Sequence, residues 1–218
     1  MSYKKDLINS IEPNFVFSKY PINRFKFNEL SSNIKDIDKK NKINNLKEKI
    51  NSIQNCNLKK NSWNSVFGHG NLNSKIMIVG EAPNEEEEKN NKTFMGESGA
   101  LLDKMLLAIN LRKRDIYSTY AINFKTPDDR KPTSQEIKRY SSYLKEHISI
   151  ISPEIIILFG STAMESILDT KERISNERGK WKEIILKNKT FQLMITFSPS
   201  YLIRFPENKK YAWEDLKM

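Results

Sequence analysis

Short apolar runs alternate with amphipathic segments from residue 75 onward. The runs predict β-strands at 75–80, 116–123, 155–160, 183–187 and 191–197. Segments with apolar residues three or four positions apart predict helices at 98–109, 134–150, 161–168 and from about 208. Strands that alternate with helices imply a mostly parallel sheet with right-handed crossovers, so the pattern predicts an α/β fold.

Local signals define some of these elements more closely. The run at 155–160 is apolar up to its final glycine, which indicates a strand buried on both faces. Thr133 is a good N-cap, and Glu136 three residues later completes a capping box. Ser161 is expected to cap the short helix that follows it.

The first sixty residues have a different pattern. Residues 1–40 are polar with scattered aromatics, and we expect an irregular extension that packs on the main body. Residues 41–60 are rich in Lys and Asn and predict an amphipathic helix. Its apolar residues at helical spacing are Ile43, Leu46, Ile50 and Ile53. Its lysines form either a solvated face or a contact with DNA. The predicted organisation is an extension at 1–40 and a single domain at 41–218.

The composition adds a preference for anionic partners. Lys and Arg number 37 against 27 Asp and Glu, which gives a net charge of +10. A basic surface favours a polyanion such as nucleic acid, although abundant Lys, Asn and Ile also accompany an AT-rich genome. A single cysteine, Cys56, excludes an internal disulfide and a cysteine-based metal cage. With only His69 and His147, a multi-histidine metal site is also disfavoured. No signal peptide or membrane-length apolar run is evident, so we expect a soluble intracellular protein.

Two Pro-bearing loops directly follow predicted strands. They are GEAP at 80–83 and SPSYL at 198–202. In open α/β sheets, loops at the carboxyl ends of strands line the ligand crevice. Glu81 in the first loop either orients a water molecule or is a helix cap or surface acid. Phe94, beside Gly96, either stacks on a flat ligand or belongs to the core. The acidic run at 85–88 is typical of a solvated surface.

The second loop combines apolar side chains with a cation. Nucleic-acid enzymes use such residues as wedges that enter a base stack. Tyr201, Leu202 and Arg204 therefore indicate either a wedge or a loop anchored to the core.

Seven segments match, in order, the motifs of the uracil-DNA glycosylase superfamily, and the chain resembles its family 4 from about residue 53 onward. GEAP at 80–83 is similar to the family's G-E-x-P-G, with Asn84 in place of the second glycine. TFMGESGALL at 93–102 is similar to P-F-V-G-x-x-G-x-L-L. The other matching segments are RKPT at 130–133, FGSTA at 159–163, RG at 178–179, TFSPSYLIR at 196–204 and AWEDL at 212–216.

The resemblance implies a three-layer α/β/α fold with a mostly parallel, four-stranded central sheet. It also implies an enzyme that flips uracil out of DNA and hydrolyses its N-glycosidic bond, leaving an abasic site. Glu81 would position water and stabilise the cationic sugar, and Ser198 would be the second catalytic residue. The implied base-binding residues are Ala82, Pro83, Phe94, Tyr120 and Asn123. The implied DNA-binding residues are Gly160, Ser161, Ser200, Tyr201, Leu202 and Arg204, with Leu202 filling the gap in the stack and Arg204 holding a phosphate.

Besides Asn84, the chain departs from the family at three places. The four cysteines that hold the family's iron–sulfur cluster fall at Ile53, Cys56, Phe124 and Tyr140. One thiolate cannot hold such a cluster, so we expect no cofactor and packing in its place. Ser198 replaces the family's histidine, which predicts slower chemistry or a donor supplied by Asn123 or a backbone N–H. Tyr120 replaces the asparagine that reads uracil, and either contacts the base edge or blocks the pocket.

Other functions stay open on the sequence. A glycosylase-like module could bind abasic or damaged DNA without catalysis, or act on another base such as a deaminated purine. A flavodoxin-like nucleotide-binding protein is a further alternative, but the first strand is not followed by its glycine-rich phosphate loop. The expected partner is DNA that contains uracil or abasic sites. We expect a monomer in the cytoplasm, associated with the nucleoid and not with a membrane.

Overall fold

The computed structural model describes residues 24–218, with side chains from residue 36 onward. The chain divides into two compact units, residues 1–37 and 38–218, and the fold described below belongs to the second. Residues 1–23 lie outside the described residues, so the packing of a 1–40 extension on the body remains a prediction. None of the described helices is long and apolar enough to cross a membrane.

Helix α2 covers Arg24–Asn51, so residues 24–40 are helical and not irregular as expected. The segment contains neither Gly nor Pro, the two residues that most often interrupt a helix. Leu46 and Ile50, one turn apart, are buried as their spacing predicted. The predicted continuation to residue 60 is wrong, because α2 ends at Asn51 and only the short helix α3, Asn57–Lys60, follows.

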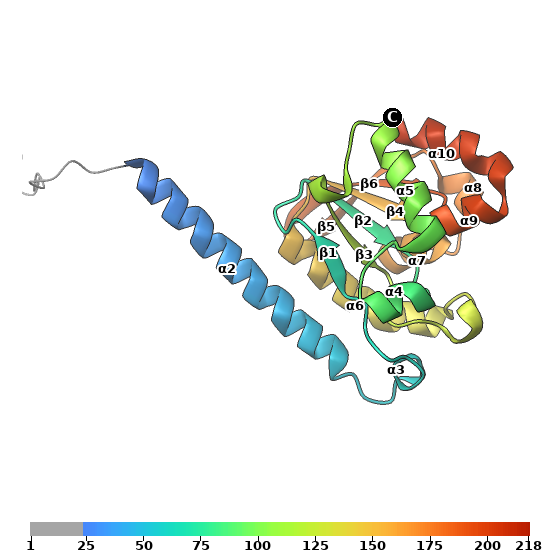
Figure 1. Cartoon of the computed structure of the whole chain (residues 1–218), viewed down its shortest axis with the longest axis horizontal. Coiled ribbons are helices and arrows are strands. Elements are labelled where there is room, and N and C mark those ends of the chain that lie inside the picture. Colours follow the sequence, from blue (N-terminus) through green and yellow to red (C-terminus); the bar gives the residue numbers. More distant parts are fainter. Residues whose placement is uncertain (1–23) are drawn as a thin grey trace, which may run out of the picture. The chain divides into compact units, whose positions relative to one another are not determined.

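The sheet has six strands in the order β1-β3-β2-β4-β6-β5 (Figure 1). Their bounds are β1 Gly68–Gly70, β2 Ile76–Gly80, β3 Ile116–Tyr120, β4 Ile155–Phe159, β5 Trp181–Leu186 and β6 Lys189–Thr196. The four inner strands are parallel, and the two edge strands pair antiparallel with their neighbours. The expected count of four is therefore wrong, although a four-stranded parallel centre is present. The strand β5 belongs to a hairpin with β6, closed by Lys187 and Asn188 at φ 48° and 63°.

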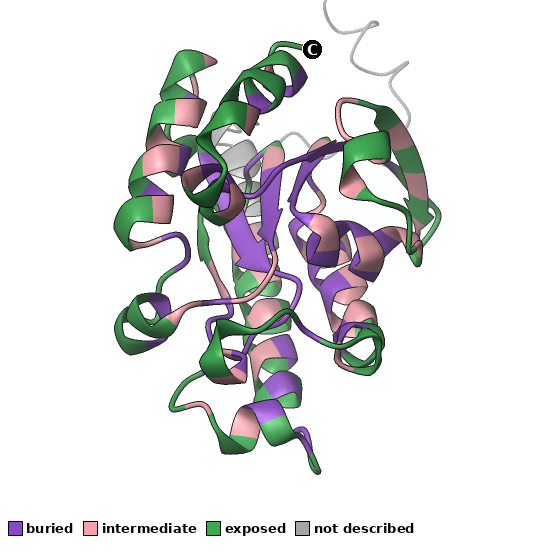
Figure 2. Ribbon diagram, turned by 90° about the vertical axis from the view of Figure 1, so that its right-hand side faces the viewer, coloured by how far each residue is buried: buried purple, intermediate pink, exposed green. Residues whose placement is uncertain are grey.

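Helices cover both faces of the sheet, as the predicted three-layer architecture requires. On one face, α6, Ser134–Ile151, and α7, Ser161–Leu168, pack their apolar residues against the strands. On the other face, α5, Gly96–Ala108, and α10, Lys209–Leu216, contribute to the core. Figure 1 shows α5 and α6 on opposite sides of the sheet, and Figure 2 shows the central strands buried, whereas the edge strand β5 is largely exposed. The remaining helices are α4 Glu85–Asn90, α8 Ile174–Glu177, α9 Pro199–Arg204 and the 3-10 turns η1 Lys113–Asp115, η2 Pro127–Asp129 and η3 Pro206–Asn208.

Capping explains several of these helix starts. The Thr133 and Glu136 capping box of α6 is confirmed. Ser161 is the first residue of α7 and not its cap, which is Gly160 at φ 98°. The acidic run is also not a solvated loop. It forms α4, whose capping box joins Asn84 and Glu87, and it buries both Glu87 and Glu88.

Neither histidine is near the loops that the sequence singled out. His147 on α6 is buried, and its Nε2 lies 2.9 Å from the hydroxyl of Tyr117 on β3. Its ring stacks on Phe67 with centroids 4.3 Å apart. Burial lowers the pKa of His147 from its ordinary value of 6.5 to about 3. The residue is therefore a neutral part of the core.

This buried histidine predicts acid sensitivity. Because the pKa of His147 is lower in the folded chain, its contribution to stability is complete above pH 6.5 and is lost as the pH falls towards 3. At pH 5 the expected loss is about 2 kcal/mol relative to pH 7, at about 1.4 kcal/mol per unit. Urea unfolding of the wild type and of His147→Phe at both pH values measures it. Equal losses in the two proteins would show that His147 does not carry the effect.

Candidate active site

The two loops predicted to line a crevice do line one cavity, at the carboxyl ends of the parallel strands. Its volume is about 520 Å³. Four stretches supply most of its lining: 80–84, 129–132, 160–162 and 197–201. Of the residues expected at the site, the cavity is lined by Glu81, Ala82, Pro83, Phe94, Tyr120, Gly160, Ser161, Ser198, Ser200, Tyr201 and Arg204. Their roles remain predictions, but they share one space.

Glu81 follows β2 and lies at the start of α7. Its Oε1 accepts a hydrogen bond from the backbone N–H of Thr162 at 3.1 Å and lies 3.5 Å from the Ser161 hydroxyl. The positive end of the helix dipole favours a carboxylate at this position. Among the described residues, no protein group hydrogen-bonds to Oε2. Glu81 can therefore bind the start of α7 through Oε1 and still present Oε2 to the cavity.

Gly160 makes this approach possible. A Cβ added to Gly160 would lie 2.3 Å from the carboxyl carbon of Glu81, and the backbone there has φ 98°. Side chains are thus excluded by both space and conformation. The glycine of the FGSTA segment is required because the carboxylate occupies the place of its side chain.

Phe94 is held in a conformation that non-glycine residues rarely adopt, with φ 52°. Its N–H donates to the hydroxyl of Tyr120 at 2.9 Å, and its carbonyl accepts from Lys113 Nζ at 2.9 Å. The rings of Phe94 and Tyr120 pack with centroids 5.1 Å apart. Tyr120 and Lys113 together fix the aromatic ring at the cavity wall.

Burial raises the pKa of Tyr120, and the charge of Glu87 raises it further. Glu87 accepts from the N–H groups of Asn84 at 2.8 Å and Met95 at 3.0 Å. Burial raises the pKa of Glu87. The Tyr120 hydroxyl accepts from the Phe94 N–H, and the Tyr120 ring packs on Phe94. Tyr120 is thus a fixed wall of the cavity.

Glu87 is a residue of the cavity that the sequence reasoning missed. It lines the space although it was counted within a solvated acidic run. The sequence does hold a signal for it, since Asn84 and Glu87 have the spacing of a capping box.

Asn123 is not in the cavity. Its side chain is buried, and Nδ2 donates to the carbonyls of Val66 at 3.1 Å and Phe67 at 3.3 Å. The predicted role of Asn123 as a base-binding residue or substitute donor is therefore wrong for this geometry, because its amide holds the segment before β1.

Leu202 is also misplaced by the sequence-based prediction. Residues 199–204 form helix α9 and not an extended loop, and Leu202 is 1% exposed among Phe197 and Ala212. Ser198 caps this helix, accepting from the Tyr201 N–H at 3.3 Å. A side chain packed into the core cannot serve as a wedge without unfolding α9.

Cations lie at the mouth of the cavity. Arg130, Lys131 and Arg204 contribute to its lining. Arg130 forms two hydrogen bonds with Glu136, of 2.9 and 2.7 Å, and lowers the pKa of that carboxyl to about 2. Glu136, which belongs to the capping box of α6, therefore also holds Arg130 in the 130–132 loop.

The positions of the family's cluster cysteines converge in a separate apolar cluster. Cys56 Sγ lies 3.1 Å from the Tyr140 hydroxyl, and the Tyr140 ring lies edge-on to Phe124 with centroids 6.1 Å apart. Ile53 is buried in the same cluster. These side chains do not fit an iron–sulfur centre, because only one of the four is a thiol. No group of three or more His, Cys, Asp or Glu able to hold a metal ion occurs among residues 36–218.

The Tyr120 hydroxyl can be tested by removing it alone. Tyr120→Phe leaves the Phe94 N–H without its buried acceptor, so we expect the free energy of unfolding to fall by about 1–3 kcal/mol. Tyr143→Phe, on a half-buried tyrosine with no described hydrogen bond, is the control and is expected to change stability by under about 0.5 kcal/mol. Urea titrations measure both, and equal stability of the two variants would contradict the role given to Tyr120.

Comparisons with known proteins agree with this geometry. Residues 67–217 match the model of the Uracil DNA glycosylase superfamily. The chain is 34% identical over 173 residues to a type-4 uracil-DNA glycosylase of Thermotoga maritima, covering 78% of this chain and 88% of that protein. It is 30% identical over 179 residues to one of Archaeoglobus fulgidus, covering 80% and 90%. With one of Sulfurisphaera tokodaii it is 33% identical over 180 residues, covering 79% and 80%.

Proposed function

The chain belongs to the uracil DNA glycosylase superfamily, and we propose that it excises uracil from DNA by hydrolysing the N-glycosidic bond. The observation that carries this proposal is the cavity that Glu81 and Phe94 share with the Ser198 loop. The flavodoxin-like alternative is wrong, since the chain belongs to another family.

Glu81 would act on the sugar side of the scissile bond. Its Oε1 is held by the start of α7, and Oε2 is left to accept a proton from water. As the bond between C1′ and the base breaks, the electron pair leaves with uracil and the sugar becomes cationic. A carboxylate beside that cation stabilises it, and the positioned water then adds to C1′ while its proton passes to Glu81.

The base would be held by shape and by a few donors. Phe94 offers a ring for stacking, which contributes about 1–3 kcal/mol against an extrusion cost of a few kcal/mol. Negative charge develops on O2 of the leaving uracil, and one well-placed donor there is typically worth about 2.7–4 kcal/mol. Ser198 Oγ accepts from Tyr201, so its own hydrogen can be donated to Ser200 or to the base. The serine reaches less far than the family's histidine, so we expect slower chemistry.

We propose further that the enzyme works without an iron–sulfur cluster. The support is the packing of Ile53, Cys56, Phe124 and Tyr140 into one apolar cluster. A monomer that acts on DNA in the cytoplasm remains a prediction from the sequence.

Substitution of the proposed catalytic carboxylate gives a direct test. Glu81→Gln can still accept from the Thr162 N–H but carries no charge, so we expect uracil release from labelled oligonucleotides to fall by at least about 100-fold. Glu85→Gln is the matched control, because Glu85 is exposed and forms a surface ion pair with Lys89 one turn away. Release that continues unchanged in Glu81→Gln would remove this residue from the mechanism.

The cofactor proposal is tested by metal analysis of the purified protein. We expect no stoichiometric iron and no visible absorbance band, with uracil release unaffected by chelators. About four irons per chain, with such a band, would contradict it.

One alternative is favoured by a specific observation, the replacement of the family's histidine and asparagine by Ser198 and Tyr120. A protein with these residues could bind abasic or damaged DNA without turnover, or act on another deaminated base. Tight binding to an abasic duplex without release of any base from a lesion panel would select the binding module. Release of a base other than uracil would show that the protein is a glycosylase for another deaminated base.

A further inference from the structure

Helix α9 cannot use the side chains that the sequence offered as a wedge. Leu202 is buried. Tyr201 is sandwiched between Phe197 and Phe205, with ring centroids 4.9 and 4.8 Å away, and its hydroxyl accepts from Asn208 Nδ2 at 3.2 Å. Both residues are committed to the fold, so an apolar contact with DNA must come from another side chain.

The same contacts point to Phe205. Three rings at positions four residues apart form a ladder in which the first two, Phe197 and Tyr201, line the cavity. Phe205 is the last ring and is 44% exposed, whereas Phe197 is 5% exposed. The ladder therefore leads from the cavity wall to the exposed ring of Phe205 at the surface. This ring is next to Tyr201, which lines the cavity.

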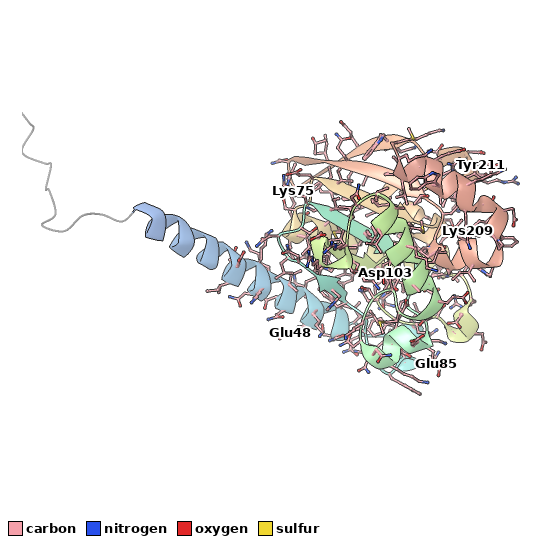
Figure 3. The ribbon with its side chains drawn as sticks, turned by 45° about the horizontal axis from the view of Figure 1, so that its top comes forward. Glu48, Lys75, Glu85, Asp103, Lys209 and Tyr211 are labelled. Atoms are coloured by element: carbon pink, nitrogen blue, oxygen red, sulfur yellow. The ribbon has the colours of Figure 1, made fainter. Side chains whose placement is uncertain are left out.

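The exposed charged residues next to Phe205 in the sequence are three cations and one acid, Glu207. Arg204 precedes it and lines the cavity, and Lys209 and Lys210 begin α10 just beyond. All three side chains are exposed, and none forms an ion pair within residues 36–218. Figure 3 shows Lys209 and Tyr211 at this end of the molecule. An exposed aromatic ring among unpaired cations matches the chemistry of a nucleic-acid strand, with bases for stacking and phosphates for charge.

We propose that Phe205 enters the base stack beside the extruded nucleotide and stacks on the neighbouring base, while Arg204 and Lys209 neutralise the adjacent phosphates. This proposal rests on the function proposed above, because it assumes that the cavity receives a base extruded from DNA.

The test uses a duplex with a tetrahydrofuran abasic analogue and 2-aminopurine next to it, so that no catalysis is needed. Wild type is expected to change the 2-aminopurine fluorescence on binding. Phe205→Ala should bind about tenfold more weakly and lose that change, in line with the contribution of one stacked base. Phe205→Trp should retain both, and Phe205→Leu should keep the fold but lose the fluorescence change.

Trp213→Ala is the control, because Trp213 on α10 is 42% exposed and forms no part of the ladder. Wild-type affinity and signal in Phe205→Ala would overturn the proposal, as would equal losses in Trp213→Ala. If Phe205→Ala is unfolded, the 2-aminopurine fluorescence changes of Phe205→Leu and Phe205→Trp are compared instead. Equal fluorescence changes in these two variants would overturn the proposal. A protein that releases no uracil yet shows this contrast would refute the proposed catalysis while the stacking role stands.

Discussion

The contact between the Glu81 carboxylate and the start of α7 organises the site. It joins the end of β2 to the helix after β4, and it exists because Gly160 leaves room for a carboxyl group where any side chain would clash. The same contact orients Oε1 towards the helix and leaves Oε2 for water. The cavity lies where these two parallel strands end, as the general position of ligand sites in open α/β sheets leads one to expect.

A second network fixes the side of the cavity that would meet the base. Phe94 keeps a strained backbone only because Tyr120 and Lys113 satisfy its N–H and its carbonyl. Glu87, which α4 holds through its capping box, raises the pKa of Tyr120. The tyrosine at the position that the resemblance assigns to the family's asparagine holds Phe94 in place.

The sequence predicted those features that depend on local chemistry. The parallel strands and the Thr133 capping box follow from apolar runs and cap spacing, and the structure has both. The two Pro-bearing segments do follow strands and line one cavity, although the second of them is helical. The errors arise where tertiary contacts decide. Asn123 looked like a free amide because the carbonyls of Val66 and Phe67 lie far from it in sequence. Glu87 looked solvated because four successive acids are usually exposed, whereas the backbone donors of Asn84 and Met95 make its burial possible. Leu202 was misjudged because Pro199 lies in the first turn of helix α9, and Leu202 lies on the buried face of that helix.

The departures from the family that the resemblance implies change the packing and the hydrogen bonding of the chain. At the positions that the resemblance assigns to the cluster cysteines, Ile53, Phe124 and Tyr140 pack around Cys56. At the base pocket, Tyr120 replaces an amide that would hydrogen-bond to uracil, and in the α9 loop Ser198 replaces a histidine. Aromatic packing is present at the first two places, whereas Ser198 keeps a hydroxyl that can donate a hydrogen bond. If the enzyme excises uracil with this set of residues, selectivity must come mainly from the shape of a rigid cavity walled by Phe94 and Tyr120. A rigid wall rejects bases that are too large more effectively than it reads their hydrogen-bonding edges, because steric overlap is costly whereas an absent amide cannot discriminate.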